Sequence, residues 1–150
     1  MPCVTKTSPR FMRTAEFTPK FIWFLDLSAA LAHRSCAMTL IYKIISQSAW
    51  RAAEVAGVFA GAPVDLADGF IHFSTAEQAR ETAMKHFVGQ SDLLLVAIDA
   101  ETLGAALKWE PSRGGALFPH LYATLDPRAA VSVRPLPLGP DGAHDFSGLL

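Results

Sequence analysis

Apolar residues follow one another without a break at positions 93–98, the most regular stretch of the chain. An unbroken apolar run of this length is typical of a strand that is buried on both faces. Residues 40–45 are rich in β-branched and aromatic side chains and predict a first strand. Residues 130–134 alternate between apolar and polar side chains, which predicts a half-buried strand. Pro135 is expected to end its pairing, because proline has no amide hydrogen to donate.

Two stretches carry the signals of helices. In the first, Ser46 or Ser48 stands where it can cap a helix over residues 49–56. In the second, Ser74 and Glu77 have the spacing of a capping box, in which each side chain reaches the backbone amide of the other. Apolar residues then recur at helical spacing until a glycine ends the helix.

The remaining stretches complete a mixed pattern. Residues 70–74 predict a short strand that runs straight into the second helix, and residues 106–110 predict another strand after a single helical turn. Residues 65–69 predict a loop, residues 118–125 are mixed, and the tail from residue 139 is expected to be irregular. About five strands around two main helices make an α+β domain.

The first 37 residues differ from the rest of the chain. They contain both cysteines, Cys3 and Cys36, so residues 38–150 alone can form neither a disulfide nor a thiolate metal site. Residues 21–32 are apolar but too few to span a membrane, and Asp26 interrupts them. A signal peptide is the alternative, but the long leading region and this charge argue against export. We therefore expect residues 1–37 to be a dispensable extension, residues 38–150 to be one domain, and the location to be cytoplasmic.

Composition and charge limit the kinds of binding partner that we expect. The chain has 150 residues, 51% of them hydrophobic, which suits one domain with a real core. Its formal net charge is −1; residues 1–37 hold five basic and two acidic side chains, so residues 38–150 carry −4. This balance disfavours nucleic acid as a partner, and no membrane partner is expected. The sequence also lacks P-loop, G-x-G-x-x-G, G-x-S-x-G and H-E-x-x-H motifs, which argues against the enzyme classes that use them.

His72 and Ser74 are polar side chains in an otherwise apolar strand. On a strand they point to the same side, and Thr75 follows where the helix begins. An imidazole, a hydroxyl and free amides at a helix N-terminus suit a phosphate or a ribose. A helix cap with one hydrogen-bonded core histidine explains the same residues, and the sequence alone favours this structural explanation.

Two further candidates lie later in the chain. Pro119 keeps the chain extended before His120, which places Tyr122 on the same side; a structural strand with a surface histidine fits equally well. Glu110 ends a strand beside a flexible glycine loop, where a carboxylate can act as a general base or orient a sugar hydroxyl. Most such glutamates are simply solvated. The two histidines and Glu110 also suit zinc by ligand type, but their spacing is not diagnostic, and no metal is expected.

Several segments together resemble a known family. They are Tyr42-Lys43-Ile44, Asp68-Gly69-Phe70-Ile71-His72-Phe73-Ser74-Thr75, Leu107-Lys108-Trp109-Glu110 and Phe118-Pro119-His120-Leu121-Tyr122. In this order they resemble the small bacterial proteins grouped as domain of unknown function 952, over about residues 38–136. The resemblance implies a compact two-sheet, ADP-ribosyltransferase-like fold, with a cleft for a dinucleotide between the sheets.

The same resemblance implies a ligand. The cleft would bind NAD, as a substrate, or another small molecule that bears ADP-ribose or phosphate. Glu110 would orient the ribose and stabilise developing positive charge during ADP-ribosyl transfer or NAD hydrolysis, and His72 and His120 would be the other catalytic residues. The residues expected to bind the cofactor are Ser74, Thr75, Tyr122 and Lys43, the last standing where active transferases have arginine or histidine. A non-catalytic binding module and an RNA 2′-phosphotransferase are the alternatives, and the oligomeric state stays open.

Overall fold

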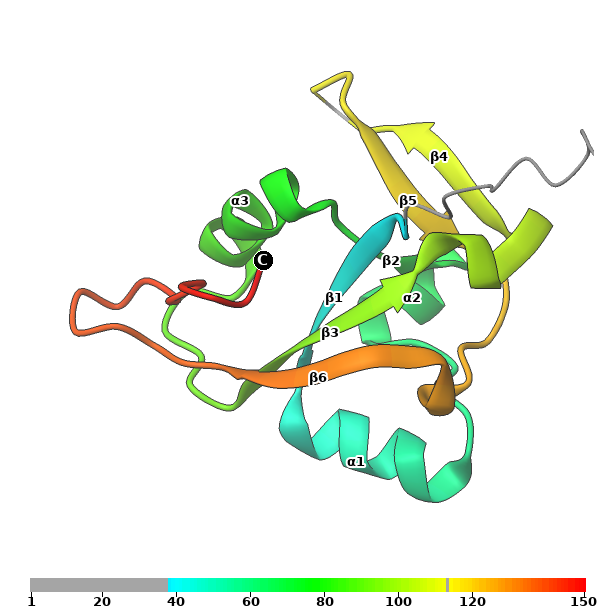
Figure 1. The fold of residues 1–150 in the computed structure, drawn as a ribbon. Coiled ribbons are helices and arrows are strands. Elements are labelled where there is room, and N and C mark those ends of the chain that lie inside the picture. Colours follow the sequence, from blue (N-terminus) through cyan, green and yellow to red (C-terminus); the bar gives the residue numbers. More distant parts are fainter. Residues whose placement is uncertain (1–37, 113) are drawn as a thin grey trace, which may run out of the picture. The chain divides into compact units, whose positions relative to one another are not determined.

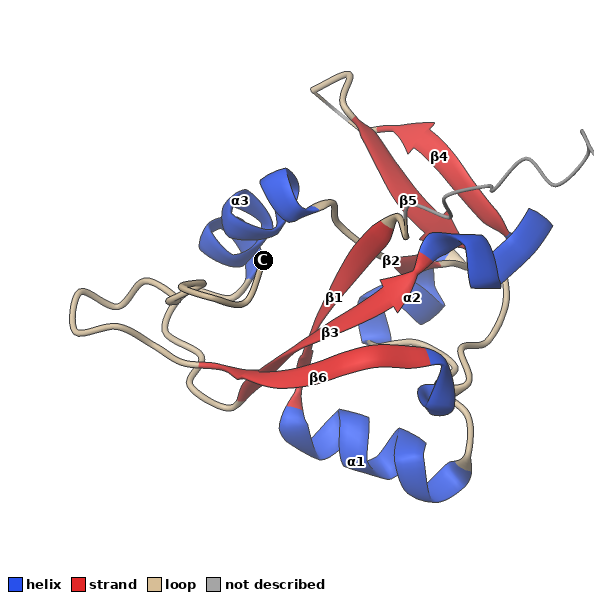
Figure 2. Ribbon diagram, in the orientation of Figure 1, coloured by secondary structure: helices blue, strands red, loops and turns tan. Residues whose placement is uncertain are grey.

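The computed structural model describes residues 38–112 and 114–150, which form two three-stranded sheets and several helices (Figures 1 and 2). In the first sheet, β3 (Leu93–Asp99) lies between β1 (Leu40–Ser46) and β6 (Ala130–Leu136) and is antiparallel to both. In the second sheet, β5 (Leu117–Leu121) lies between the short β2 (Ile71–His72) and β4 (Leu107–Pro111), again antiparallel to both. The α+β class that the sequence predicts is confirmed.

Helices connect these strands. They are α1 (Gln47–Ala56), α2 (Pro63–Asp68) and α3 (Ala76–His86), together with the 3₁₀ segments η2 (Ala100–Ala106) and η3 (Pro127–Ala129). Ser46 caps α1 by accepting a hydrogen bond from the amide of Ala49, as one of the two predicted caps. Within the part of the chain that the structure describes, no helix has the length and apolar character needed to cross a membrane.

The first sheet is covered on both faces, which is why β3 is apolar from Leu93 to Ile98. On one face, β1 and β3 pack with Trp50 of α1 and with Ile71 and Leu121 of the second sheet. On the other face, they pack with Ala79 and Ala83 of α3. Every residue of β3 is buried, so the predicted strand at 93–98 is confirmed together with its two-sided burial.

The start of α3 lies one residue later than the sequence pattern predicts. Thr75, and not Ser74, is the N-cap: its side chain accepts from the amide of Gln78, and the Gln78 side chain accepts from the amide of Thr75. Ser74 is still extended, because its backbone exchanges two hydrogen bonds with Tyr42 of β1. The predicted box of Ser74 and Glu77 is therefore wrong, although the helix itself is confirmed.

Residues 65–69 were expected to form a loop, but residues 63–68 form α2. Pro63 opens this helix, where its missing amide hydrogen is not needed, and the carboxylate of Asp65 accepts a hydrogen bond from the amide of Ala62. Gly69 ends the helix at a φ of 82°, a conformation that glycine adopts without strain. The prediction was wrong because α2 has fewer than two turns and lies between Gly61 and Gly69, with Pro63 at its start, and these residue types usually indicate a loop.

Two strand boundaries also differ from expectation. The predicted strand 70–74 pairs with β5 at residues 71–72, and the amide of Phe73 still donates to the carbonyl of Pro119 before Ser74 pairs with Tyr42 of the first sheet. Pro135 does not end β6: it lies opposite Leu94, and pairing continues to Leu136. Since β6 is an edge strand of its sheet, a proline can be accommodated where an amide would face solvent.

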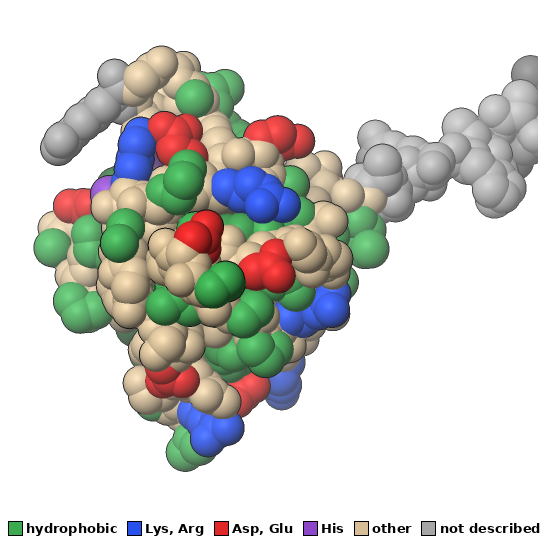
Figure 3. All heavy atoms as spheres, turned by 90° about the vertical axis from the view of Figure 1, so that its left-hand side faces the viewer, with side chains coloured by type: hydrophobic (Ala, Val, Ile, Leu, Met, Phe, Trp, Pro, Cys, Tyr) green, Lys and Arg blue, Asp and Glu red, His purple; other side chains and the backbone are tan. Residues whose placement is uncertain are grey.

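Acidic and basic side chains alternate with apolar ones on the face shown in Figure 3, without a block of one sign. Charges of both signs are thus interspersed on this face.

Candidate functional site

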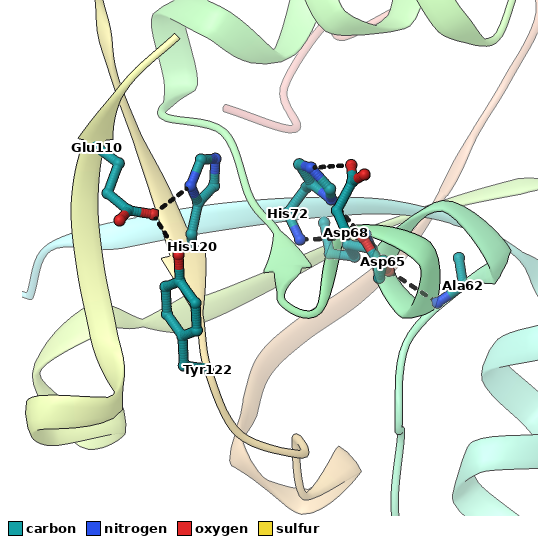
Figure 4. A network of polar contacts seen from close by, with 8 residues as sticks. Ala62, Asp65, Asp68, His72, Glu110, His120 and Tyr122 are labelled. Atoms are coloured by element: carbon teal, nitrogen blue, oxygen red, sulfur yellow. Dashed lines mark hydrogen bonds and ion pairs between the residues drawn. The ribbon is translucent and has the colours of Figure 1, made fainter.

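Polar side chains gather on one face of the second sheet. His120 of β5 lies directly opposite His72 of β2 on one side and Lys108 of β4 on the other. Because side chains alternate along a strand, Glu110 and Tyr122 share this face, while Leu121, between His120 and Tyr122, turns to the core. Figure 4 shows Glu110, His120 and Tyr122 together, with His72 on the neighbouring strand. The two imidazole centroids are 5.3 Å apart.

Glu110 organises one side of this group. Its Oε2 accepts hydrogen bonds from Nδ1 of His120 at 2.8 Å and from the hydroxyl of Tyr122 at 2.9 Å. The bond from His120, and then the bond from Tyr122, lowers the pKa of Glu110, and the same contact raises the pKa of Tyr122. Glu110 is thus an ionised acceptor at neutral pH and Tyr122 a protonated donor. Among the described residues, Oε1 of Glu110 has no hydrogen-bond partner.

Asp65 of α2 organises the other side. Its carboxylate is fully buried and accepts from Nδ1 of His72 at 2.7 Å and from the backbone amide of His72 at 3.0 Å. Lys43, reaching across from β1, donates to both carboxylate oxygens at 2.8 and 2.7 Å. The amide of Ala62 completes the set at 2.7 Å. Asp65 therefore holds the ring of His72 in a fixed orientation and ties it to the first sheet.

The charges of this pair follow from its surroundings. Burial on its own would raise the pKa of Asp65, but the hydrogen bond from His72 and the charge and hydrogen bond of Lys43 outweigh it and hold that pKa far below its usual range. Burial lowers the pKa of Lys43, and the charge of Asp65 opposes this shift. The carboxylate of Asp65 is thus ionised in the folded protein at neutral and mildly acidic pH.

His72 has a second carboxylate beside it. Its Nε2 lies 3.2 Å from an oxygen of Asp68, at the end of α2, and about half of the Asp68 side chain is exposed. Both ring nitrogens of His72 therefore face carboxylate oxygens, whereas Nε2 of His120 has no hydrogen-bond partner among the residues that the structure describes. The two imidazoles therefore differ in their hydrogen-bond partners, although they lie side by side in an edge-on arrangement.

Phe70 packs against both imidazoles. Its ring is stacked on His120, with centroids 4.2 Å apart and planes inclined by 25°, and its centroid lies 4.6 Å from that of His72. Beside it opens a hollow of about 260 Å³, in which Phe70 and Tyr122 meet the end of α2 and residues 121–124. An aromatic ring at the edge of such a hollow offers a stacking surface for a planar ligand.

The structure brings together four of the seven residues singled out from the sequence: His72, Glu110, His120 and Tyr122. The other three are engaged elsewhere. Lys43 is buried against Asp65, the hydroxyl of Ser74 is hydrogen-bonded to that of Thr82 in α3, and Thr75 caps α3. The geometry gives no support for contacts of these three with a ligand on the polar face, and their binding role stays a prediction.

Sequence reasoning missed three residues of the site: Asp65, Asp68 and Phe70. A local signal could have found Asp65: a proline at the first helical position followed two residues later by an aspartate, as in Pro63 and Asp65, is typical of a helix start. Asp68 was predicted only as part of a turn, and Phe70 only as the first residue of the short strand 70–74. Within residues 38–112 and 114–150, no group of three His, Cys, Asp or Glu side chains is arranged to hold a metal ion.

Comparisons with known proteins give two similar solved structures and one family. The crystal structure of protein CC0527 from Caulobacter crescentus is 53% identical, with a TM-score of 0.72 over 74% of this chain and 97% of that one. The solution NMR structure of CC0527 is 54% identical, with a TM-score of 0.69 over 75% and 97%. No curated protein matches the chain. Residues 44–133 match the sequence pattern of the family described as protein of unknown function (DUF952), and the chain belongs to that family.

Proposed function

We propose that the polar face of the second sheet binds NAD or another small molecule that carries ADP-ribose or phosphate. The observation that carries this proposal is the meeting of His72, Glu110 and His120, from three separate stretches of chain, on one face of the second sheet. About a third of the side chains of His72 and Glu110 is exposed, so a ligand can reach them.

Glu110 suits the ribose. Its Oε2 is held by His120 and Tyr122, and its Oε1 is available to accept from a sugar hydroxyl. A carboxylate that is already oriented and ionised also stabilises positive charge that develops at an anomeric carbon. In a reacting complex, this would favour cleavage of the bond between nicotinamide and ribose, with transfer to an acceptor or to water.

The surroundings suit the rest of such a ligand. Phe70 and Tyr122 line the neighbouring hollow and offer aromatic surface to a nicotinamide or adenine ring. Two small antiparallel sheets are compatible with the ADP-ribosyltransferase-like fold that we propose for the family. The charge of −4 on residues 38–150 favours a small ligand over a nucleic acid.

Calorimetry with NAD and with ADP-ribose on the full chain tests binding. We expect Glu110→Gln to weaken binding by about ten-fold or more, since a charged acceptor of sugar hydroxyls is lost. Glu81→Gln, which changes an exposed glutamate of α3 in the same way, is the matched control and should bind as the unaltered protein does. Absence of heat at millimolar ligand, or equal weakening by both variants, would overturn the proposal.

Release of free nicotinamide from NAD, followed by chromatography, separates an enzyme from a binding module. Release that depends on Glu110 supports transfer or hydrolysis. Binding without any product supports the non-catalytic alternative on the same fold.

A further inference from the structure

Three nitrogen bases form a straight row across the second sheet. His72, His120 and Lys108 occupy directly opposed positions on β2, β5 and β4, so their side chains leave the same face next to one another. The ammonium group of Lys108 lies 4.2 Å from the ring centroid of Tyr122, on the same face. Binding of a nucleotide at Glu110 does not require three nitrogen bases side by side, so this row suggests a further role.

His120 is arranged as a proton acceptor. Glu110 is ionised and can only accept, so Nδ1 of His120 carries the hydrogen of their 2.8 Å contact. In the neutral ring, Nε2 then presents its lone pair, and no described residue donates to it. A histidine whose far nitrogen is held by a carboxylate is the usual arrangement of a general base.

His72 is arranged as a proton donor. Asp65 accepts from its Nδ1, and an oxygen of Asp68 lies 3.2 Å from its Nε2, so a hydrogen on Nε2 would have a carboxylate beside it. Asp65 is buried and fixed by Lys43, whereas the Asp68 side chain is half-exposed. Departure of Asp68 would leave the Nε2 hydrogen open to an oxygen atom of a ligand.

We propose that this row cleaves a short ribonucleoside phosphodiester that has a free 2′-hydroxyl. His120 removes the proton of the 2′-hydroxyl, and the 2′-oxygen forms a bond to phosphorus. The bond from phosphorus to the 5′-oxygen breaks, and His72 gives its proton to that leaving oxygen. The products are a 2′,3′-cyclic phosphate and a 5′-hydroxyl, and a proton exchange with water restores both rings.

The neighbouring groups fit this substrate class. Lys108 is placed to balance the charge that builds on the phosphoryl oxygens in the transition state. The hollow beside Phe70 and Tyr122 has room for one base and not for a long strand. The charge of −4 on residues 38–150 likewise favours a dinucleotide over a polynucleotide.

The test uses the full chain and the dinucleoside monophosphate uridylyl-(3′→5′)-adenosine, with product separation by chromatography. We expect cyclic phosphate and adenosine to form, and the 2′-deoxy analogue to stay intact. His120→Gln and His72→Gln should each slow cleavage by about a hundred-fold or more. His86→Gln, an exposed histidine at the end of α3, is the matched control and should keep the full rate. Lys108→Ala, a change on the exposed side of the sheet, should also slow cleavage and does not depend on the fold of the histidine variants.

The proposal is overturned if no cyclic phosphate forms, if the deoxy analogue is cleaved equally fast, or if His86→Gln loses as much activity. If the protein binds NAD but does not cleave the phosphodiester, the proposed function stands and this inference fails. If it cleaves the phosphodiester but does not bind NAD, this inference stands and only the proposed function fails.

Discussion

Asp65 is the residue on which the orientation of His72 depends. Its carboxylate is buried and receives hydrogen bonds from Lys43, Ala62 and His72. A buried ion pair adds little net stability, but removing one partner leaves a buried charge without compensation. Lys43→Met should therefore lower the free energy of unfolding by about 3–5 kcal/mol, as measured by urea denaturation. Lys85→Met, which removes a lysine from the exposed surface of α3, should change it by less than about 1 kcal/mol.

The same carboxylate predicts a loss of stability in acid. The pKa of Asp65 is lower in the folded protein than in the unfolded chain, so the unfolded state binds a proton first. The contribution of Asp65 is complete above its unfolded pKa and decreases as the pH falls below about 4. Urea unfolding between pH 7 and pH 2.5 should show this decrease. Asp65→Asn should flatten the curve in that range, and an unchanged slope would contradict the assignment.

At the scale of elements, α3 depends on its cap. Thr75 and Gln78 satisfy each other's backbone amides at its first turn. Thr75→Ala should lower the free energy of unfolding by about 1 kcal/mol, because an amide at the helix start loses its partner. Ser91→Ala, in the exposed loop before β3, should have little effect in the same denaturation experiment.

Elements with strong repeating patterns were predictable from the sequence, and short ones were not. An unbroken apolar run predicts that β3 is buried on both faces, and the helical spacing of alanines predicts α3. By contrast, α2 is stabilised by Asp65, whose partners Lys43 and His72 are 22 and 7 residues away along the chain. No local pattern shows such contacts. For the same reason, the meeting of His72, Glu110 and His120 was expected only from the family resemblance.

At the scale of the whole molecule, both core clusters of the described part lie between Leu40 and Leu149. A chain that begins at Met38 should therefore unfold in one cooperative transition, with the same melting temperature as the full chain. Circular dichroism during heating checks this. A broad or absent transition in the shorter chain would show that residues 1–37 take part in its stability.

The contact between Lys43 and Asp65 crosses from the first sheet to the segment that leads into the second. Replacing either side chain alone leaves an unpaired charge in the interior, whereas replacing both with apolar residues does not. The two residues should consequently have been conserved or replaced together during evolution. In an alignment of the family, positions 43 and 65 should co-vary, and homologues that lack both should also lose the histidine at position 72.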